Sequence, residues 1–119
     1  MSNELKINIE KTAIVVIDLQ KGITSIPTEP YPSKTVVENS VKILNVARKN
    51  NMPVFLVHVT PSPDMKDALR PVSETSFQMS GYNPSWSEFV PELNIQPSDF
   101  LITKHQWGAF YGTERLDIK

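Results

Sequence analysis

One short stretch constrains the fold of this chain more than any other. Five consecutive apolar residues, 13–17, end directly at the acidic residue Asp18. The run is too short to cross a membrane, and it does not alternate as a half-solvated strand would. Its Val and Ile content is typical of a strand covered on both faces at the centre of a parallel sheet. The stretch therefore predicts an α/β fold with Asp18 at the carboxyl end of its first strand.

The position of Asp18 favours a functional role. Ligands of open α/β sheets bind outside the carboxyl ends of the strands, so an acid at that point is well placed for chemistry. The alternative is a charge that only ends a strand at the surface. Leu19 and Gln20, which follow, are not a solvent-seeking run, and this favours the functional interpretation.

Charge and composition limit the partners and the chemistry. A net charge of -1 and a pI of about 6.1 give no basic field for nucleic acid or an anionic membrane, so a small molecule is the expected partner. The 119 residues contain no cysteine, which excludes disulfides, cysteine-ligated zinc and a thiolate nucleophile within this sequence.

The GxGxxG motif and closely spaced His and acidic ligands are also absent, so we expect no cofactor and no metal. Residues 1–11 lack the apolar core of a signal peptide, which predicts a cytoplasmic protein.

Apolar periodicity predicts one long helix and two further strands. Residues 33–50, with Ser33 as N-cap, carry apolar side chains at three- and four-residue spacing, which is typical of a helix. The run 54–59 follows a short joint, so strand, helix and strand predict a right-handed crossover between parallel strands. Residues 100–103 predict a third strand that ends at Lys104.

The segments between these elements are expected to be irregular or short. Residues 21–32 are rich in proline and predict a loop beside the site. The long stretch 60–87 predicts a lid or short helices, with one or two helical turns over 63–69. Residues 87–93 predict a short helix whose Phe89, Val90 and Leu93 face inward. The chain from Thr113 onward predicts the start of a last helix.

Parallel strands would bring Asp18 and Lys104 to one edge of the sheet. Such a pair keeps both groups charged. A plain surface salt bridge, worth at most about 1 kcal/mol, fits the pattern equally well. Trp107 and Phe110 follow Lys104 around a glycine, where they could wall an apolar pocket or fill the core under a loop. His58, near the end of the second strand, is more often a hydrogen-bonded core or rim residue than a catalyst.

Together these motifs resemble a known enzyme family. TAIVVIDLQKG at 12–22 and ITKHQWGAFYGTE at 102–114 are similar to the first two signature regions of the isochorismatase-like (cysteine hydrolase) family, and VFLVHVTP resembles its second strand. The resemblance covers essentially the whole chain. It implies a three-layer α/β/α fold, with the first strand near the middle of a parallel sheet.

The resemblance also implies a reaction, the hydrolysis of a small amide or vinyl ether by an Asp, Lys and Cys triad. Asp18 matches the general base, and Lys104 matches the lysine that stabilises negative charge. Gln20, Trp107 and Phe110 are expected near the pocket. The stretch HVTPSPDMKD lacks the acid-and-histidine motif of the relatives that hydrolyse nicotinamide, so the resemblance implies no catalytic metal.

The third member of the triad has no counterpart here. In the family the cysteine follows a fourth strand, so residues 1–119 are expected to form a single domain that is incomplete at its C-terminus, after the third strand. Two functions stay open: a hydrolase whose activity is impaired by the missing cysteine, or an inactive relative that binds a small molecule or a protein. The missing half would leave a flat apolar edge on the first strand. We therefore expect either that these residues are part of a longer polypeptide or that a partner supplies the missing strands, and the bare edge also favours a homo-oligomer.

Overall fold

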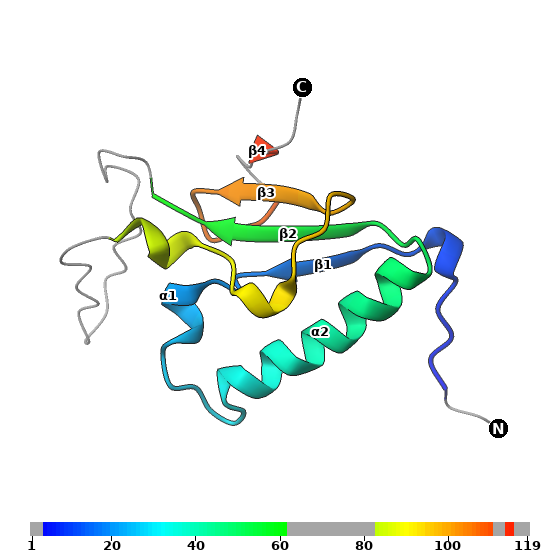
Figure 1. The fold of residues 1–119 in the computed structure, drawn as a ribbon, viewed down its shortest axis with the longest axis horizontal. Helices are drawn as coiled ribbons and strands as arrows, with labels where there is room; N and C mark the ends of the chain where they lie inside the picture. Colours follow the sequence, from blue (N-terminus) through cyan, green and yellow to red (C-terminus); the bar gives the residue numbers. More distant parts are fainter. Residues whose placement is uncertain (1–3, 62–82, 111–113, 116–119) are drawn as a thin grey trace.

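A sheet of four strands, in the order β1-β2-β3-β4, forms the centre of the structure (Figure 1). The computed structural model describes residues 4–61, 83–110 and 114–115. Strands β1 (Ile14–Ile17), β2 (Val54–Val59) and β3 (Phe100–Lys104) are parallel, and β4 (Glu114–Arg115) is antiparallel to β3. The α/β class with a parallel sheet is therefore confirmed. The prediction of a helix from Thr113 onward is wrong for Glu114 and Arg115, which pair with β3 instead.

Helix α2 (Ser33–Lys49) is the crossover between β1 and β2. It begins one residue earlier than predicted, because Pro32 is the N-cap and Ser33 the first helical residue. Proline suits this position because it needs no N–H partner and its φ is already fixed. Beyond the end of the helix, Asn51 takes a left-handed φ of 57°, which asparagine tolerates, and the chain then turns into β2.

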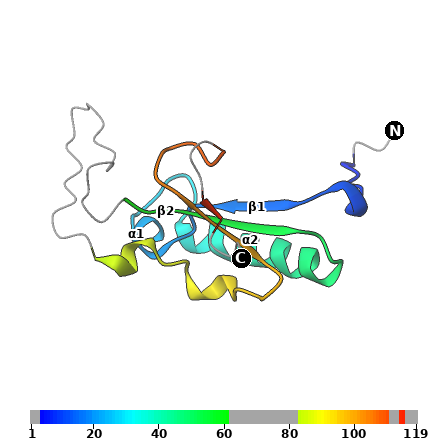
Figure 2. The ribbon, with the colours of Figure 1, turned by 90° about the horizontal axis from the view of Figure 1, so that it is seen from above.

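The hydrophobic core lies between α2 and one face of the sheet. Figure 2 shows α2 and the short turns of residues 84–93 on the same side of β1 and β2. Every second residue of β1 and β2 points into this layer, together with the apolar stripe of α2. The fully buried members are Val37, Leu44, Ala47, Val54, Leu56, Val90 and Leu93. Their burial fixes the register of β1 against β2, with Ile14 beside Val54.

The opposite face of the sheet is only partly covered. Val15 and Ile17 of β1 are 42% and 40% exposed, so the expectation of a strand covered on both faces is wrong for the described residues. Strand β1 also lies at the edge of the sheet, with β2 as its described neighbour. Phe55 and Phe100, which are paired in register, stack on each other at 4.8 Å between ring centroids.

Two short segments differ from the sequence prediction. Residues 21–32, expected to be loop, begin with a four-residue helix, α1 (Lys21–Thr24). The predicted helix over 87–93 is wrong: two 3₁₀ turns, η2 (Pro84–Ser87) and η3 (Pro91–Leu93), flank an extended stretch. That stretch is extended because its backbone bonds the chain after β1, with the Val90 N–H donating to the carbonyl of Leu19 at 3.1 Å.

The inward-facing residues of that segment were nevertheless predicted correctly. Val90 and Leu93 are buried in the core, and Phe89 packs against it. The helical turns expected within 63–69, and Thr113, lie outside the described residues. No helix in the described part of the chain is long and apolar enough to span a membrane.

Candidate active site

Asp18 is held in a special backbone conformation at the end of β1. Its φ is 67°, in the left-handed region that costs a residue with a side chain about 1 kcal/mol or more. The Asp18 N–H donates to the carbonyl of Val57 at 2.9 Å, so the strand pairing continues up to the bend. Such strain is concentrated at functional sites, and here it turns the carboxylate toward the end of β3.

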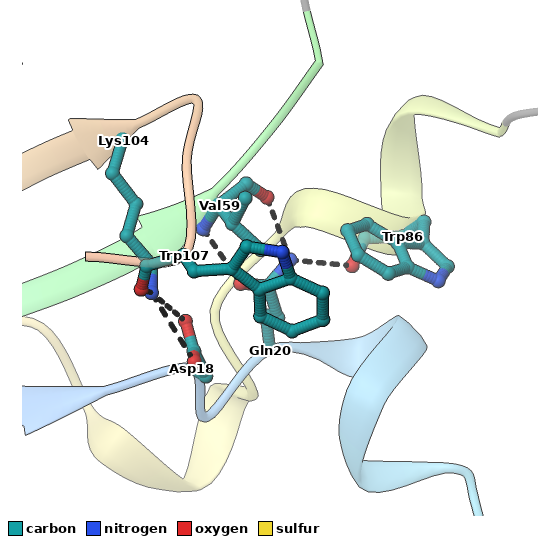
Figure 3. Close-up of polar contacts among 6 residues, drawn as sticks. All are labelled: Asp18, Gln20, Val59, Trp86, Lys104 and Trp107. Carbon is teal, nitrogen blue, oxygen red and sulfur yellow. Dashed lines mark hydrogen bonds and ion pairs between the residues drawn. The ribbon is translucent and has the colours of Figure 1, made fainter. Parts of the chain in front are cut away.

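Lys104 is the group that Asp18 meets. Its side chain is only 4% exposed, and its Nζ lies 3.2 Å from Asp18 Oδ1 (Figure 3). Nζ also donates hydrogen bonds to Asp18 Oδ2 at 3.4 Å and to the carbonyl of Trp107 at 2.9 Å. A buried ammonium needs such partners to offset its desolvation. The predicted meeting of the two strand-end charges is confirmed; their catalytic roles stay predictions.

The carboxylate of Asp18 keeps one oxygen free of hydrogen bonds. Oδ1 is buried and accepts no hydrogen bond from the described residues. It contacts Lys104 Nζ as an ion pair, without the geometry of a hydrogen bond. The side chain as a whole is 36% exposed, so the pair differs from a fully enclosed structural ion pair. An ionised carboxylate with an unused oxygen, beside a fixed positive charge, can accept a proton from an approaching group.

Gln20 is fully buried and bonds to backbone groups (Figure 3). Its Nε2 donates to the carbonyl of Val59 at 2.9 Å and to the carbonyl of Trp86 at 3.3 Å, and its Oε1 accepts from the Val59 N–H at 2.8 Å. The structure thus places Gln20 two residues from Asp18, with its amide directed at β2 and η2. Val59 and Trp86 take part through their main chains, so residue type gave no signal of their involvement.

Trp107 and Phe110 lie on the loop that follows β3. These two residues are 73% and 87% exposed, so in the described part of the chain they neither fill the core nor enclose a pocket. The backbone of Trp107 is fixed by its bond from Lys104, which keeps the start of the loop beside the ion pair. The described structure therefore brings Asp18, Lys104 and the Trp107 backbone together, with the two aromatic rings in solvent.

A separate cavity lies next to Leu19. It has a volume of about 280 Å³ and is bounded by α1, residues 28–31 and the first turns of α2. Its lining is mostly apolar and includes Leu19, Ile23, Tyr31 and Val36. None of the five predicted site residues lines it, but most of its lining belongs to residues 21–32, the segment expected beside the site.

His58 has a structural environment. Its Nδ1 lies 2.6 Å from the carbonyl oxygen of Ser87, its Nε2 lies 2.9 Å from Thr103 Oγ1, and its ring stacks on Phe89. This agrees with the favoured interpretation of a hydrogen-bonded core or rim histidine. Within residues 4–61 and 83–110, no three His, Asp or Glu side chains come together as metal ligands.

Comparison with known proteins gives one consistent family. Residues 12–118 match the family model described as isochorismatase domain. The uncharacterized isochorismatase family protein YwoC of Bacillus subtilis is 45% identical over 121 residues, which are all of this chain and 61% of that protein. The similarly described YecD of Escherichia coli O157:H7 is 37% identical over 110 residues, 92% of this chain and 58% of that protein.

A solved structure agrees with these relatives. An isochorismatase family protein from Burkholderia thailandensis superposes with a TM-score of 0.75 at 40% identity, covering 85% of this chain and 53% of that one. The chain therefore spans about three fifths of the length of the curated relatives it matches, and about half of this solved structure.

Proposed function

The chain belongs to the isochorismatase family, and on that basis we propose that it carries the acid and the lysine of a hydrolytic site for a small amide or vinyl ether. One observation supports this proposal above all others. Asp18, in a strained conformation at a strand end, lies 3.2 Å from the buried Lys104, and one of its carboxylate oxygens accepts no hydrogen bond from the residues that the structure describes. An ion pair that served stability alone would have no need of the strain or of the free oxygen.

The two residues have complementary tasks in the proposed reaction. The Asp18 carboxylate, whose side chain is 36% exposed, takes the proton of the attacking nucleophile, as a general base does. The Lys104 ammonium stabilises the negative charge on the nucleophile and on the substrate oxygen. The bond from Lys104 to the Trp107 carbonyl holds the ammonium in place, so its direction toward Asp18 is set before substrate binds.

The nucleophile is proposed to come from outside these residues. The family uses a cysteine thiolate, and this sequence contains no cysteine. Attack of a thiolate on an amide carbonyl forms a thioester and releases ammonia, and water then cleaves the thioester. Gln20 acts as a positioning residue, because its bonds tie the chain after Asp18 to β2 and η2. Trp107 and Phe110 are proposed to close over an apolar part of the substrate.

A second function has one observation in its favour. Because the sequence lacks a cysteine, the same site could bind a small molecule without turning it over. In that case Lys104 would bind a polar group of the ligand and the exposed aromatic rings its apolar part. The cytoplasmic location and the self-association expected from the sequence stay predictions under both functions.

Ligand-induced stabilisation tests whether the site binds the proposed substrates. Thermal unfolding of the chain would be followed with acetamide, benzamide and a small alkyl vinyl ether as probes. At a probe concentration 100-fold above Kd, binding stabilises the folded state by about 2.7 kcal/mol. We expect stabilisation by at least one probe in the native chain, and its loss in Lys104→Met.

Lys21→Met is the matched control for this experiment. Lys21 is half-exposed, and its charge is paired with Glu88 at 2.5 Å. The control should therefore be stabilised by the probe as the native chain is. If no probe stabilises the native chain, or if Lys104→Met responds as fully as Lys21→Met, the proposed site is wrong.

A further inference from the structure

The cavity next to Leu19 is lined by none of the residues proposed for hydrolysis. Its volume of about 280 Å³ is close to the lower end of the roughly 300–1,000 Å³ of typical ligand sites. It is also about twice the ~150 Å³ of an apolar cavity that holds benzene. A ligand of one ring and a short chain is therefore the size that the cavity admits.

Apolar side chains form most of the cavity wall. Leu19 and Ile23 contribute from the chain after β1, Pro30 from the loop that follows α1, and Val36 from α2. Val36 is 42% exposed, although α2 carries much of the core. Covering this apolar surface with the apolar body of a ligand removes it from water, which is favourable. A ring or an alkyl chain is thus the part of a ligand that belongs in the cavity.

Three hydroxyl groups of the lining are left as hydrogen-bond acceptors. Thr24, Thr28 and Ser33 donate their hydroxyl protons to backbone carbonyls, at 3.1, 2.7 and 3.4 Å. A hydroxyl has one proton, so each of these groups offers only lone pairs to a ligand. The lining residues are all within the described part of the chain, and among their side chains only the exposed Tyr31 keeps an uncommitted O–H. The lining therefore suits a ligand that donates hydrogen bonds.

Glu29 gives the cavity a negative charge. It is the only charged residue of the lining, it is exposed, and it forms no ion pair or hydrogen bond with the residues that the structure describes. The first turn of α2 also borders the cavity, and the positive end of a helix favours an anion. That end carries only about half an elementary charge, and its Thr35 and Val36 N–H groups already donate to the Pro32 carbonyl. The full charge of Glu29 is larger, so the cavity favours a cation.

We infer that this cavity binds a small organic ammonium, whose ring or alkyl body lies against Leu19, Ile23 and Val36 and whose cationic group lies beside Glu29. The ammonium supplies the hydrogen-bond donors that the three hydroxyl groups lack and the counter-charge that Glu29 lacks. The exposed ring of Tyr31 adds a face of the kind that attracts a cation. The site is separate from Asp18 and Lys104, and binding there requires no hydrolysis.

Two probes that differ in charge test this inference. 2-Phenylethylamine and 3-phenylpropionate share a ring on a two-carbon chain, but at neutral pH the first is a cation and the second an anion. Calorimetric titration of the native chain should show the amine binding at least about five-fold more tightly, as an exposed ion pair allows. In Glu29→Gln the two affinities should come within about two-fold of each other. Glu92→Gln removes an exposed charge outside the lining and should keep the preference for the amine.

A second pair of variants locates the apolar part of the site. Val36→Trp fills the cavity, whereas Val46→Trp adds the same ring at an exposed position of α2 outside the lining. The first should weaken amine binding at least about ten-fold, and the second should leave it unchanged. Far-UV spectra check that each variant still folds. In the native chain, the amine should shift the methyl resonances of Ile23 and Val36 and leave those of Val15 and Ile17 in place.

Four results would each overturn the inference: no binding of the amine, equal or tighter binding of the anion, a preference for the amine that survives in Glu29→Gln, or equal amine binding by the two tryptophan variants. Lys104→Met separates this site from the hydrolytic one. It should bind the amine as the native chain does, and a changed affinity would place the amine at Asp18 instead. Because the readout is amine binding and not turnover, the inference can fail while the proposed function stands.

Discussion

The side-chain amide of Gln20 pairs with the backbone of Val59 through two hydrogen bonds, as the peptide of a neighbouring strand would. Strand β1 ends at Ile17, and Asp18 bends the chain away from the sheet. The side-chain amide of Gln20 then forms the hydrogen bonds to β2 that the backbone of β1 no longer makes. Hydrogen bonds to β2 therefore hold the chain both before Asp18 and after it, at Gln20. Such surrounding contacts are what allow a strained backbone conformation to persist.

Truncation of this amide should be costly. Gln20→Ala leaves the Val59 carbonyl and N–H without their partner at a site that is fully buried. Each buried polar group that loses its hydrogen bond costs about 1–3 kcal/mol, so we expect the free energy of unfolding to fall by about 2–5 kcal/mol. Urea denaturation measures it. The control is Gln96→Ala, which removes an exposed hydrogen bond to the Asn94 carbonyl and should change the free energy of unfolding by less than about 0.5 kcal/mol. Equal losses in the two variants would show that the Gln20 hydrogen bonds contribute no more to stability than an exposed one.

The packing of Gly22 against Trp86 predicts an unusual sign for a glycine substitution. Alanine in place of a helical glycine normally stabilises a helix by up to about 1 kcal/mol. At Gly22, however, a Cβ would overlap the Trp86 ring, so the ring or α1 must move. We expect Gly22→Ala to lower the melting temperature, at a cost of about 1–3 kcal/mol. Gly108→Ala has open space for its Cβ and is the control; a stabilised Gly22→Ala would contradict the packing.

A buried ion pair should hold the far end of the sheet to α2. Arg48 donates to both carboxylate oxygens of Asp99, at 2.6 and 3.3 Å, and Asp99 also accepts from the N–H of Gln96 at 2.9 Å. The Asp99 side chain is almost fully buried, so Asp99→Ala leaves the guanidinium largely desolvated and unpaired. We expect a loss of about 3–5 kcal/mol in the free energy of unfolding.

The exposed pair of Lys34 and Glu38 gives the comparison for Asp99. These groups are 3.9 Å apart on the surface of α2, where such pairs are worth a few tenths of a kcal/mol. Glu38→Gln should therefore leave the denaturation midpoint almost unchanged. A cost for Asp99→Ala no larger than that of Glu38→Gln would mean that the Arg48 pair contributes no more than a surface contact.

The Asp18 and Lys104 pair should respond unequally to loss of its two members. Asp18→Asn keeps a residue that tolerates a positive φ, but it leaves a nearly buried ammonium without its counter-charge. Lys104→Met replaces the ammonium by an apolar chain and leaves Asp18 with part of its surface in water. We expect Asp18→Asn to cost about 1–3 kcal/mol and Lys104→Met to cost less, both by urea denaturation. The reverse order would contradict the assignment of Lys104 as the more desolvated partner.

Much of the sheet and the central pair could be predicted from sequence, because both follow from local pattern and parallel topology. Residues 54–59 predicted β2 to the residue, and helix α2 differed by one residue at its start. The juxtaposition of Asp18 and Lys104 required only that both strands run in one direction and end at the same level. Neither conclusion depended on a contact between irregular segments.

The remainder depends on long-range backbone contacts that leave no pattern in the sequence. Residues 88–90 are extended because they pair with the chain after β1, which overrides the helical spacing of Phe89, Val90 and Leu93. Gln20 was expected near a pocket from its place after Asp18, whereas its burial depends on the carbonyl of Trp86, 66 residues away. Residue type does not reveal which main-chain groups a side chain will reach.

The most direct test is the hydrolysis of a small amide by the chain completed with the unmatched segment of a family member, chosen because that segment contains a cysteine. Ammonia release would be measured for the native complex and for Asp18→Asn in the same complex. We expect turnover by the native complex and a fall of at least about 100-fold in the variant, since a general base contributes about 10²–10⁴-fold. A native complex without turnover, or an Asp18→Asn complex that releases ammonia at a similar rate, would contradict the claim that Asp18 and Lys104 form a hydrolytic site.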